Sequence, residues 1–186
     1  MVVNASSGVA GVTEFIRWAK QRPGNVRFGS SGTGQPDHLA GEFFQRLAGL
    51  NMMHVPYKGG GPALVDLVAG QIQVMFSTYI VAAPHVKSGR LRALAVIAPQ
   101  RQPLLPDLQT VAESVPGFGL NNWNGMFTPA KTPRDIANRL FVEINRALKA
   151  PDLKERQNAL GIEPVGSESS EDFAKLKRMW PPPAPR

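Results

Sequence analysis

The chain has 186 residues, of which 42% are hydrophobic and 19% are charged, a balance typical of a folded globular protein. It contains no cysteine, which excludes disulfides, thiolate nucleophiles and cysteine-bound metal centres. The net charge is +7, but the lysines and arginines are scattered singly and no aromatic side chains alternate with them. We therefore expect no nucleic-acid partner. We also expect no membrane span, because no apolar run has the necessary length.

Short apolar runs alternate with amphipathic segments over the first half of the chain. The predicted strands cover residues 26–28, 52–55, 72–76 and 91–97. The predicted helices cover residues 14–22 (capped by Thr13), 36–48, 62–69 and 81–86. Residues 2–3 are interpreted only as a short apolar stub. Strands that alternate with helices of this length predict an α/β fold with a parallel sheet.

The rest of the chain begins with a proline-rich stretch, residues 99–119, for which we expect irregular structure. A further strand is predicted at 122–127, followed by a long helix that starts at Thr132-Pro133. Its apolar residues form one stripe: Ile136, Leu140, Ile144 and Leu148. A shorter helix is predicted over 152–160, and a last one begins near Ser169 or Ser170 and ends before Pro181.

Two glycine-rich loops each connect a predicted strand to a predicted helix, at residues 29–34 and 58–61. Ligands of open α/β sheets bind at this edge, and the unpaired N–H groups of a helix start favour an anion. Loop 29–34 adds the hydroxyls of Ser30, Ser31 and Thr33. From the residues alone, this loop is either a cradle for a carboxylate or phosphate, or an ordinary tight turn.

Known catalytic motifs do not match these loops. Gly32-Thr33-Gly34 lacks the third glycine of a dinucleotide fingerprint, and neither Ser30 nor Ser31 has the flanking glycines of a nucleophile elbow. His38 follows Ser30 by eight residues, so a serine hydrolase or acyl-transfer enzyme that pairs His38 with Ser30 or Ser31 stays open as an alternative. The histidines have no metal-ligand spacing, and we expect neither metal nor cofactor.

Taken together, the loops and strands resemble the Bug family, the substrate-binding proteins of tripartite tricarboxylate transporters of the Bordetella uptake gene type. The resemblance extends almost continuously from Val2 to Phe173. The runs that carry it are Val26–Gly34, His38–Glu42, His54–Gly59, Gly70–Phe76, Gly89–Val96, Leu105–Asp107, Thr110–Glu113, Pro116–Phe118, Gly125 with Phe127, and Glu163–Gly166.

This resemblance implies a periplasmic binding protein type II-like fold, with one near-complete parallel α/β domain plus a partial second domain. Residues 5–122 would be the domain with the ligand loops, and 123–186 a remnant of the other domain, most of which is absent. It implies an extracytoplasmic solute-binding protein, not an enzyme, that binds a small carboxylated solute. The implied partner is a membrane permease of the tripartite tricarboxylate type. A cytosolic ligand-sensing module is a further alternative.

The residues expected to bind the substrate lie at the ends of strands in the family-like domain. They are Gly29, Ser30, Ser31, Gly32, Thr33, Gly34, Gln35, His38, Tyr57, Lys58, Gly59 and Ser77. The sequence departs from the family at Gln35-Pro36-Asp37, where Ser-Thr-His is commoner, and at Ser77-Thr78, where Asp-Asn is commoner.

Larger departures concern the two ends of the chain. Family members begin with an additional segment preceded by a signal peptide, and they continue a helix after the position of Phe173. The chain therefore resembles a truncated gene product, which would be cytoplasmic if translated as given. We expect the stripe that starts at Ile136 to be left uncovered, so that the chain self-associates and binds carboxylates more weakly than a complete member.

Overall fold

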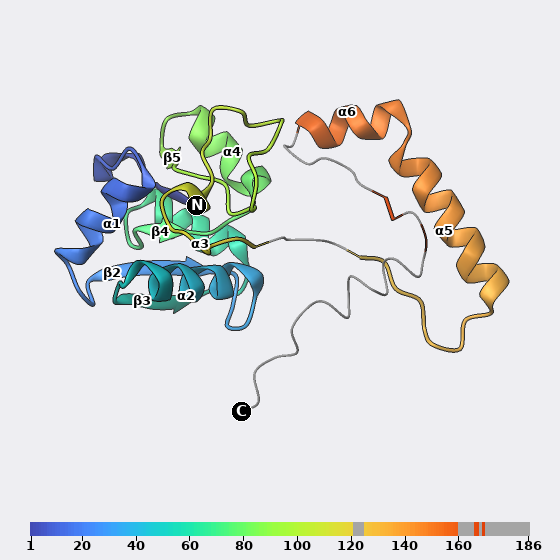
Figure 1. Ribbon diagram of the computed structural model, residues 1–186, viewed down its shortest axis with the longest axis horizontal. Helices are drawn as coiled ribbons and strands as arrows, with labels where there is room; N and C mark the ends of the chain where they lie inside the picture. Colours follow the sequence, from blue (N-terminus) through green and yellow to red (C-terminus); the bar gives the residue numbers. More distant parts are fainter. Residues whose placement is uncertain (121–124, 160–165, 168, 170–186) are drawn as a thin grey trace. The chain divides into compact units, whose positions relative to one another are not determined.

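The structure is a computed structural model that describes residues 1–120, 125–159, 166, 167 and 169 (Figure 1). The chain divides into two compact units, Met1–Trp123 and Asn124–Arg186. Among the described residues, the first unit contains a five-stranded sheet and four α-helices, and the second contains two α-helices. Both predicted glycine-rich loops therefore belong to the first unit.

The sheet of the first unit is mixed. Its strands lie in the order β3 (Met52–Pro56), β2 (Val26–Ser30), β4 (Val74–Met75), β1 (Val2–Asn4) and β5 (Leu91–Ala93). Strand β2 runs parallel to both β3 and β4, as predicted. Strand β1 is antiparallel to β4 and β5, so the prediction of a wholly parallel sheet was wrong. A three-residue run has no periodicity of its own, and its two partners lie far along the chain.

Helices cover both faces of this sheet and bury two apolar clusters. On one face, α1 (Val12–Lys20) and α2 (Pro36–Ala48) contribute Phe15 and Phe44 to a cluster with Phe28 of β2. On the other face, α3 (Gly60–Val68) and α4 (Tyr79–Lys87) pack Leu67 and Ala82 against Met75 of β4. Alternating side chains of β1 and β4 enter opposite clusters, which is the arrangement of a three-layer α/β/α sandwich.

Local signals set most of the element boundaries. Pro36 occupies the first turn of α2, and Gly49 ends the helix at φ 62°, both as predicted. Helix α1 is capped by Gly11 rather than by Thr13, which lies inside the helix. Strands β4 and β5 are shorter than predicted. Beyond β5, Val96 leaves the sheet and forms an isolated bridge with Thr110. A short 3₁₀ helix, η1 (Ala5–Ser7), follows β1.

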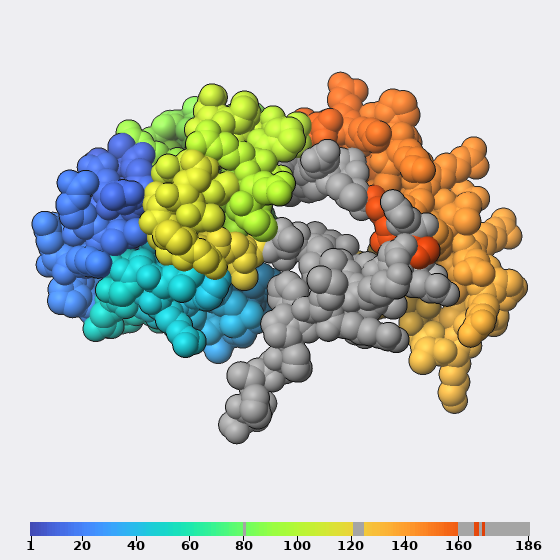
Figure 2. Space-filling model, viewed as in Figure 1, coloured from blue at the N-terminus to red at the C-terminus, as the bar shows by residue number. Residues whose placement is uncertain are grey.

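The proline-rich stretch is irregular, as predicted, but it is held by specific contacts. The 3₁₀ helix η2 (Val111–Glu113) begins with a capping box in which Thr110 and Glu113 each bond the other's backbone. The hydrogen-bonded Arg101 guanidinium lowers the pKa of Glu113 to about 2. Phe118 stacks on Phe43 of α2 with the ring centroids 5.4 Å apart. Figure 2 shows the yellow part of this stretch against the blue surface of α1.

The second unit contains α5 (Arg134–Leu148) and α6 (Pro151–Ala159), close to their predicted positions. Ile136 and Leu140 of the predicted stripe are 48% and 44% exposed. Self-association through this stripe stays a prediction. Residues 125–127 form no strand, and the rest of the strand predicted there, like the helix predicted after Ser169, lies outside the described residues. Within the described ranges, no helix is long and apolar enough to cross a membrane.

Candidate functional site

The two glycine-rich loops form one connected surface at an edge of the sheet. They follow β2 and β3, which are parallel neighbours, so both loops leave the sheet at the same edge. The Tyr57 N–H donates to the Ser30 carbonyl at 3.0 Å, and the Gly59 N–H donates to the Ser31 carbonyl at 3.0 Å. These bonds hold residues 29–35 beside residues 57–59, two of the segments that are expected to bind the substrate.

Ser30 pairs with His54, not with His38. Its Oγ is buried, lies 2.7 Å from His54 Nε2 and accepts a hydrogen bond from the Gly32 N–H at 3.2 Å. The Ser30–His38 pair, which the sequence left open as an alternative, is not what the structure shows: the Gly34 N–H donates to His38 Nδ1 at 3.1 Å. A fully buried hydroxyl is not placed to attack a substrate, so Ser30 with its histidine supports the shape of the loop.

His54 is not among the residues that the sequence predicted for the site, although one signal for it was available. His54 is the register partner of Phe28 across the parallel strands β3 and β2, and register partners point to the same face. The two rings stack with centroids 4.9 Å apart. The His38 ring also belongs to this cluster, with its centroid 3.9 Å from that of His54 and 6.2 Å from that of Phe28. Since His54 bonds to Ser30 and His38 bonds to Gly34, this aromatic stack is tied to loop 29–35.

Ser31 is bound by the chain's own carboxylate. The Ser31 N–H donates to Asp37 Oδ2 at 2.6 Å, and its hydroxyl donates to Asp37 Oδ1 at 2.8 Å. Asp37 lies in the first turn of α2, where the helix dipole also favours a negative charge. The sequence marked Asp37 only as a departure from the family pattern and assigned it no contact. Two of the donors expected to face a ligand are thus already in use.

Other donors at the two loops remain open. Among the residues that the structure describes, the main-chain N–H groups of Thr33 and Lys58 have no acceptor. The N–H groups of Gly60 and Gly61 begin α3, where no earlier helical carbonyl can accept them. A Cβ built on Gly59, Gly60 or Gly61 would meet nothing within 4 Å, so this loop is accessible to a ligand. Such a set of N–H groups can bind a carboxylate.

Tyr57 and Ser77 make different contributions from those expected. The Tyr57 hydroxyl donates to Asp66 Oδ2 of α3 at 2.6 Å. Burial and this hydrogen bond raise the pKa of Tyr57 to about 12. The hydroxyl is therefore tied to α3 and orients the loop from within. Ser77 follows β4 at the same sheet edge, but its hydroxyl bonds only to the carbonyl of Thr78 in the structure described here. No hydrogen bond among the described residues joins Ser77 to either loop.

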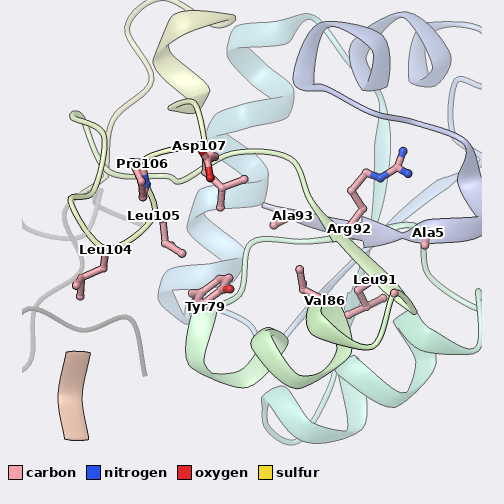
Figure 3. Close-up of a pocket in the computed structure, with 12 residues that line it drawn as sticks. Ala5, Tyr79, Val86, Leu91, Arg92, Ala93, Leu104, Leu105, Pro106 and Asp107 are labelled. Carbon is pink, nitrogen blue, oxygen red and sulfur yellow. The ribbon is translucent and has the colours of Figure 1, made fainter. Parts of the chain in front are cut away.

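A separate hollow of about 450 Å³ lies elsewhere in the first unit. Figure 3 shows Tyr79 and Val86 of α4, Leu91 of β5 and Leu105 of the following loop around it. Its lining is mostly apolar, and none of the predicted binding residues contributes to it. The glycine-rich loops and this hollow are therefore two different surface features.

The histidine stack predicts a dependence of stability on pH. Burial, and then the nearby His38, lower the pKa of His54, while Glu42 and Asp37 oppose the shift. The unfolded chain, with histidine near its ordinary pKa of 6.5, then binds protons more readily than the folded chain. We expect the free energy of unfolding to fall as the pH falls from about 7.5 through 6.5, with a smaller fall in His54→Gln. Urea unfolding at several pH values measures both slopes.

A comparison with a shared background and one control variant isolate His54 in that experiment. The buried α-amino group of Met1 has its pKa lowered to about 5, which adds to the slope in parent and variant alike. The difference between the two proteins therefore reports His54 alone. His85→Gln removes a histidine from α4 instead. Equal slopes in the parent and His54→Gln would contradict the prediction.

The sequence of this α/β chain, with its two glycine-rich loops, was compared with those of known proteins, and the comparison shows its family. Residues 1–178 match the pattern of the tripartite tricarboxylate transporter family receptor. The chain belongs to this family, as its resemblance to Bug proteins predicted. A protein of Pseudomonas sp. (strain P51), encoded in the tcbD–tcbE intergenic region, is 39% identical over 168 residues, which are 89% of this chain and 50% of that protein. BugT of Bordetella pertussis is 34% identical over 89% of this chain and 51% of its own length.

Solved structures agree with this assignment. An R. palustris protein determined with adipate superposes with a TM-score of 0.90 at 31% identity, covering 95% of this chain and 59% of that one. The periplasmic binding protein BugD gives a TM-score of 0.84 at 29% identity, with 95% and 60% covered. MatC of Rhodopseudomonas palustris, determined with bound malate, gives 0.83 at 27% identity, with 95% and 61% covered. The chain thus spans about half the length of the two curated relatives.

Proposed function

We propose that this chain is the loop-bearing part of a receptor that binds a small carboxylated solute. The observation that carries the proposal is the joined pair of loops at one sheet edge, with open N–H groups at Thr33, Lys58, Gly60 and Gly61. Neutral N–H donors at a helix start suffice to hold a carboxylate. The adipate and malate in two similar proteins belong to the same chemical class.

We further propose that unit Met1–Trp123 corresponds to the predicted ligand-loop domain, and Asn124–Arg186 to part of the other domain. In this proposal the receptor delivers its solute to a membrane permease of the tripartite tricarboxylate type. A periplasmic location follows from the same relationship, since BugD is a periplasmic binding protein. The chain serves as a receptor rather than as an enzyme, because the buried Ser30 hydroxyl offers no nucleophile to a solute.

An NMR titration of the ¹⁵N-labelled chain tests the function and the site together. The probe is hexanoate, which has one carboxylate, and 1-hexanol is the uncharged control. We expect hexanoate to shift the amide signals of Thr33, Lys58, Gly60 and Gly61, because their N–H groups would donate to the carboxylate. Hexanol should leave these signals in place. Shifts confined to residues around the apolar hollow, such as Leu91 and Leu105, or no shifts at all, would contradict the proposal.

A further inference from the structure

The first loop already holds a carboxylate, that of Asp37. Asp37 accepts the Ser31 N–H and hydroxyl at 2.6 and 2.8 Å, and its Oδ1 also accepts the N–H of His38 at 3.0 Å. Three donors of the kind that an incoming carboxylate would use are thereby engaged. The negative charge stays at the loop, because none of the described lysines or arginines forms an ion pair with Asp37.

The second loop has the opposite character. Lys58 is exposed and carries a positive charge, and no carboxylate in the described part of the chain accepts a hydrogen bond from the N–H groups of Lys58, Gly60 or Gly61. Tyr57, the residue before Lys58, donates its hydroxyl hydrogen bond to the Asp66 carboxylate, so among the described contacts this carboxylate is bonded to a side chain and not to the N–H groups of the loop. The two loops are joined through the bond from Gly59 to Ser31. A solute at this edge therefore meets a negative group on one loop and open donors on the next.

We propose that Asp37 is a specificity-determining residue that selects against solutes with more than one carboxylate. The proposal rests on the proposed function and names its substrate class. The single carboxylate of the solute binds the open N–H groups of Thr33 and of loop 58–61, and the part of the solute beside Asp37 is a protonated amine. A second carboxylate in that place would repel Asp37, whereas an ammonium group would be attracted to it. The preferred solute is thus a zwitterionic amino acid rather than a dicarboxylate.

Calorimetric titration of the full chain with three probes of equal length tests this selection. The probes are 6-aminohexanoate, hexanoate and adipate, which place an ammonium, a methyl and a carboxylate at the same end. We expect the parent chain to bind 6-aminohexanoate about tenfold more tightly than adipate, with hexanoate between them. This order is measured on the unaltered chain, so it does not depend on whether a variant folds. Adipate binding as tightly as 6-aminohexanoate, or more tightly, would overturn the proposal.

Asp37→Asn removes the charge while an amide oxygen can still accept the Ser31 N–H. We expect this variant to reduce the preference for 6-aminohexanoate over adipate by about tenfold. Glu14→Gln is the matched control, because it removes one negative charge from an exposed position of α1. An unchanged preference in Asp37→Asn would refute the role of Asp37, although hexanoate would still bind. Failure of every probe to bind the parent and the variant would instead refute the proposed function, and the selection with it.

Discussion

Gly32→Val is expected to weaken hexanoate binding by about tenfold to a hundredfold. Gly32 has φ 147°, a conformation that residues with a side chain rarely adopt and that a β-branched residue tolerates least. A Cβ here would lie 3.5 Å from Gln35 Cγ and 3.6 Å from the Tyr57 carbonyl oxygen, which are ordinary contacts. The effect therefore comes from the backbone, where strain of about 1–3 kcal/mol would change the course of the loop. Calorimetry with parent and variant measures the loss.

A matched control comes from the opposite edge of the sheet. Gly8 also has a positive φ, 73°, and follows β1, which runs against β2 and leaves the sheet at the other edge. Gly8→Val should lower the stability through the same backbone strain but leave hexanoate affinity unchanged. Equal losses of affinity in the two variants would show that strain weakens binding through the fold in general. An unchanged affinity in Gly32→Val would remove loop 29–35 from the site.

Gly41→Val is expected to lower the free energy of unfolding by about 1–3 kcal/mol. Gly41 is buried in α2, and a Cβ at this position would overlap the ring of Phe28 in β2. That ring is itself buried and stacked on His54, so it has no free space into which to move. Helix α2 must then move away from the sheet. At a position with free space around the Cβ, by contrast, replacing a helical glycine by alanine is favourable.

Gly61→Ala provides that open position. Gly61 lies in the first turn of α3, and its Cβ would meet nothing within 4 Å. We expect the stability of Gly61→Ala to equal or slightly exceed that of the parent. Urea unfolding of the three proteins measures the free energies. A Gly41→Val chain as stable as the parent would show that α2 does not pack on β2 through this glycine.

The sequence alone determined the elements whose signals are local. Pro36 and Gly49 marked both ends of α2, because a missing N–H suits a helix start and a positive φ suits its end. The glycine-rich loops were likewise visible, and the parallel neighbours β2 and β3 placed them at one edge as the α/β pattern predicted. The family was predictable for a related reason, since its motifs are runs of neighbouring residues that keep their order and spacing.

Only the tertiary structure decided what depends on residues that are distant in sequence. Strand β1 owes its place to Met75 and Ala93, and no local pattern could reveal these partners. The partner of Ser30 is His54 rather than His38, because strand register, not sequence distance, brings side chains together. The position of the Asp37 carboxylate at the first loop also depends on the tertiary structure. Asp37 could be read from the sequence, but its two bonds to Ser31 exist only because the loop folds back onto the first turn of α2.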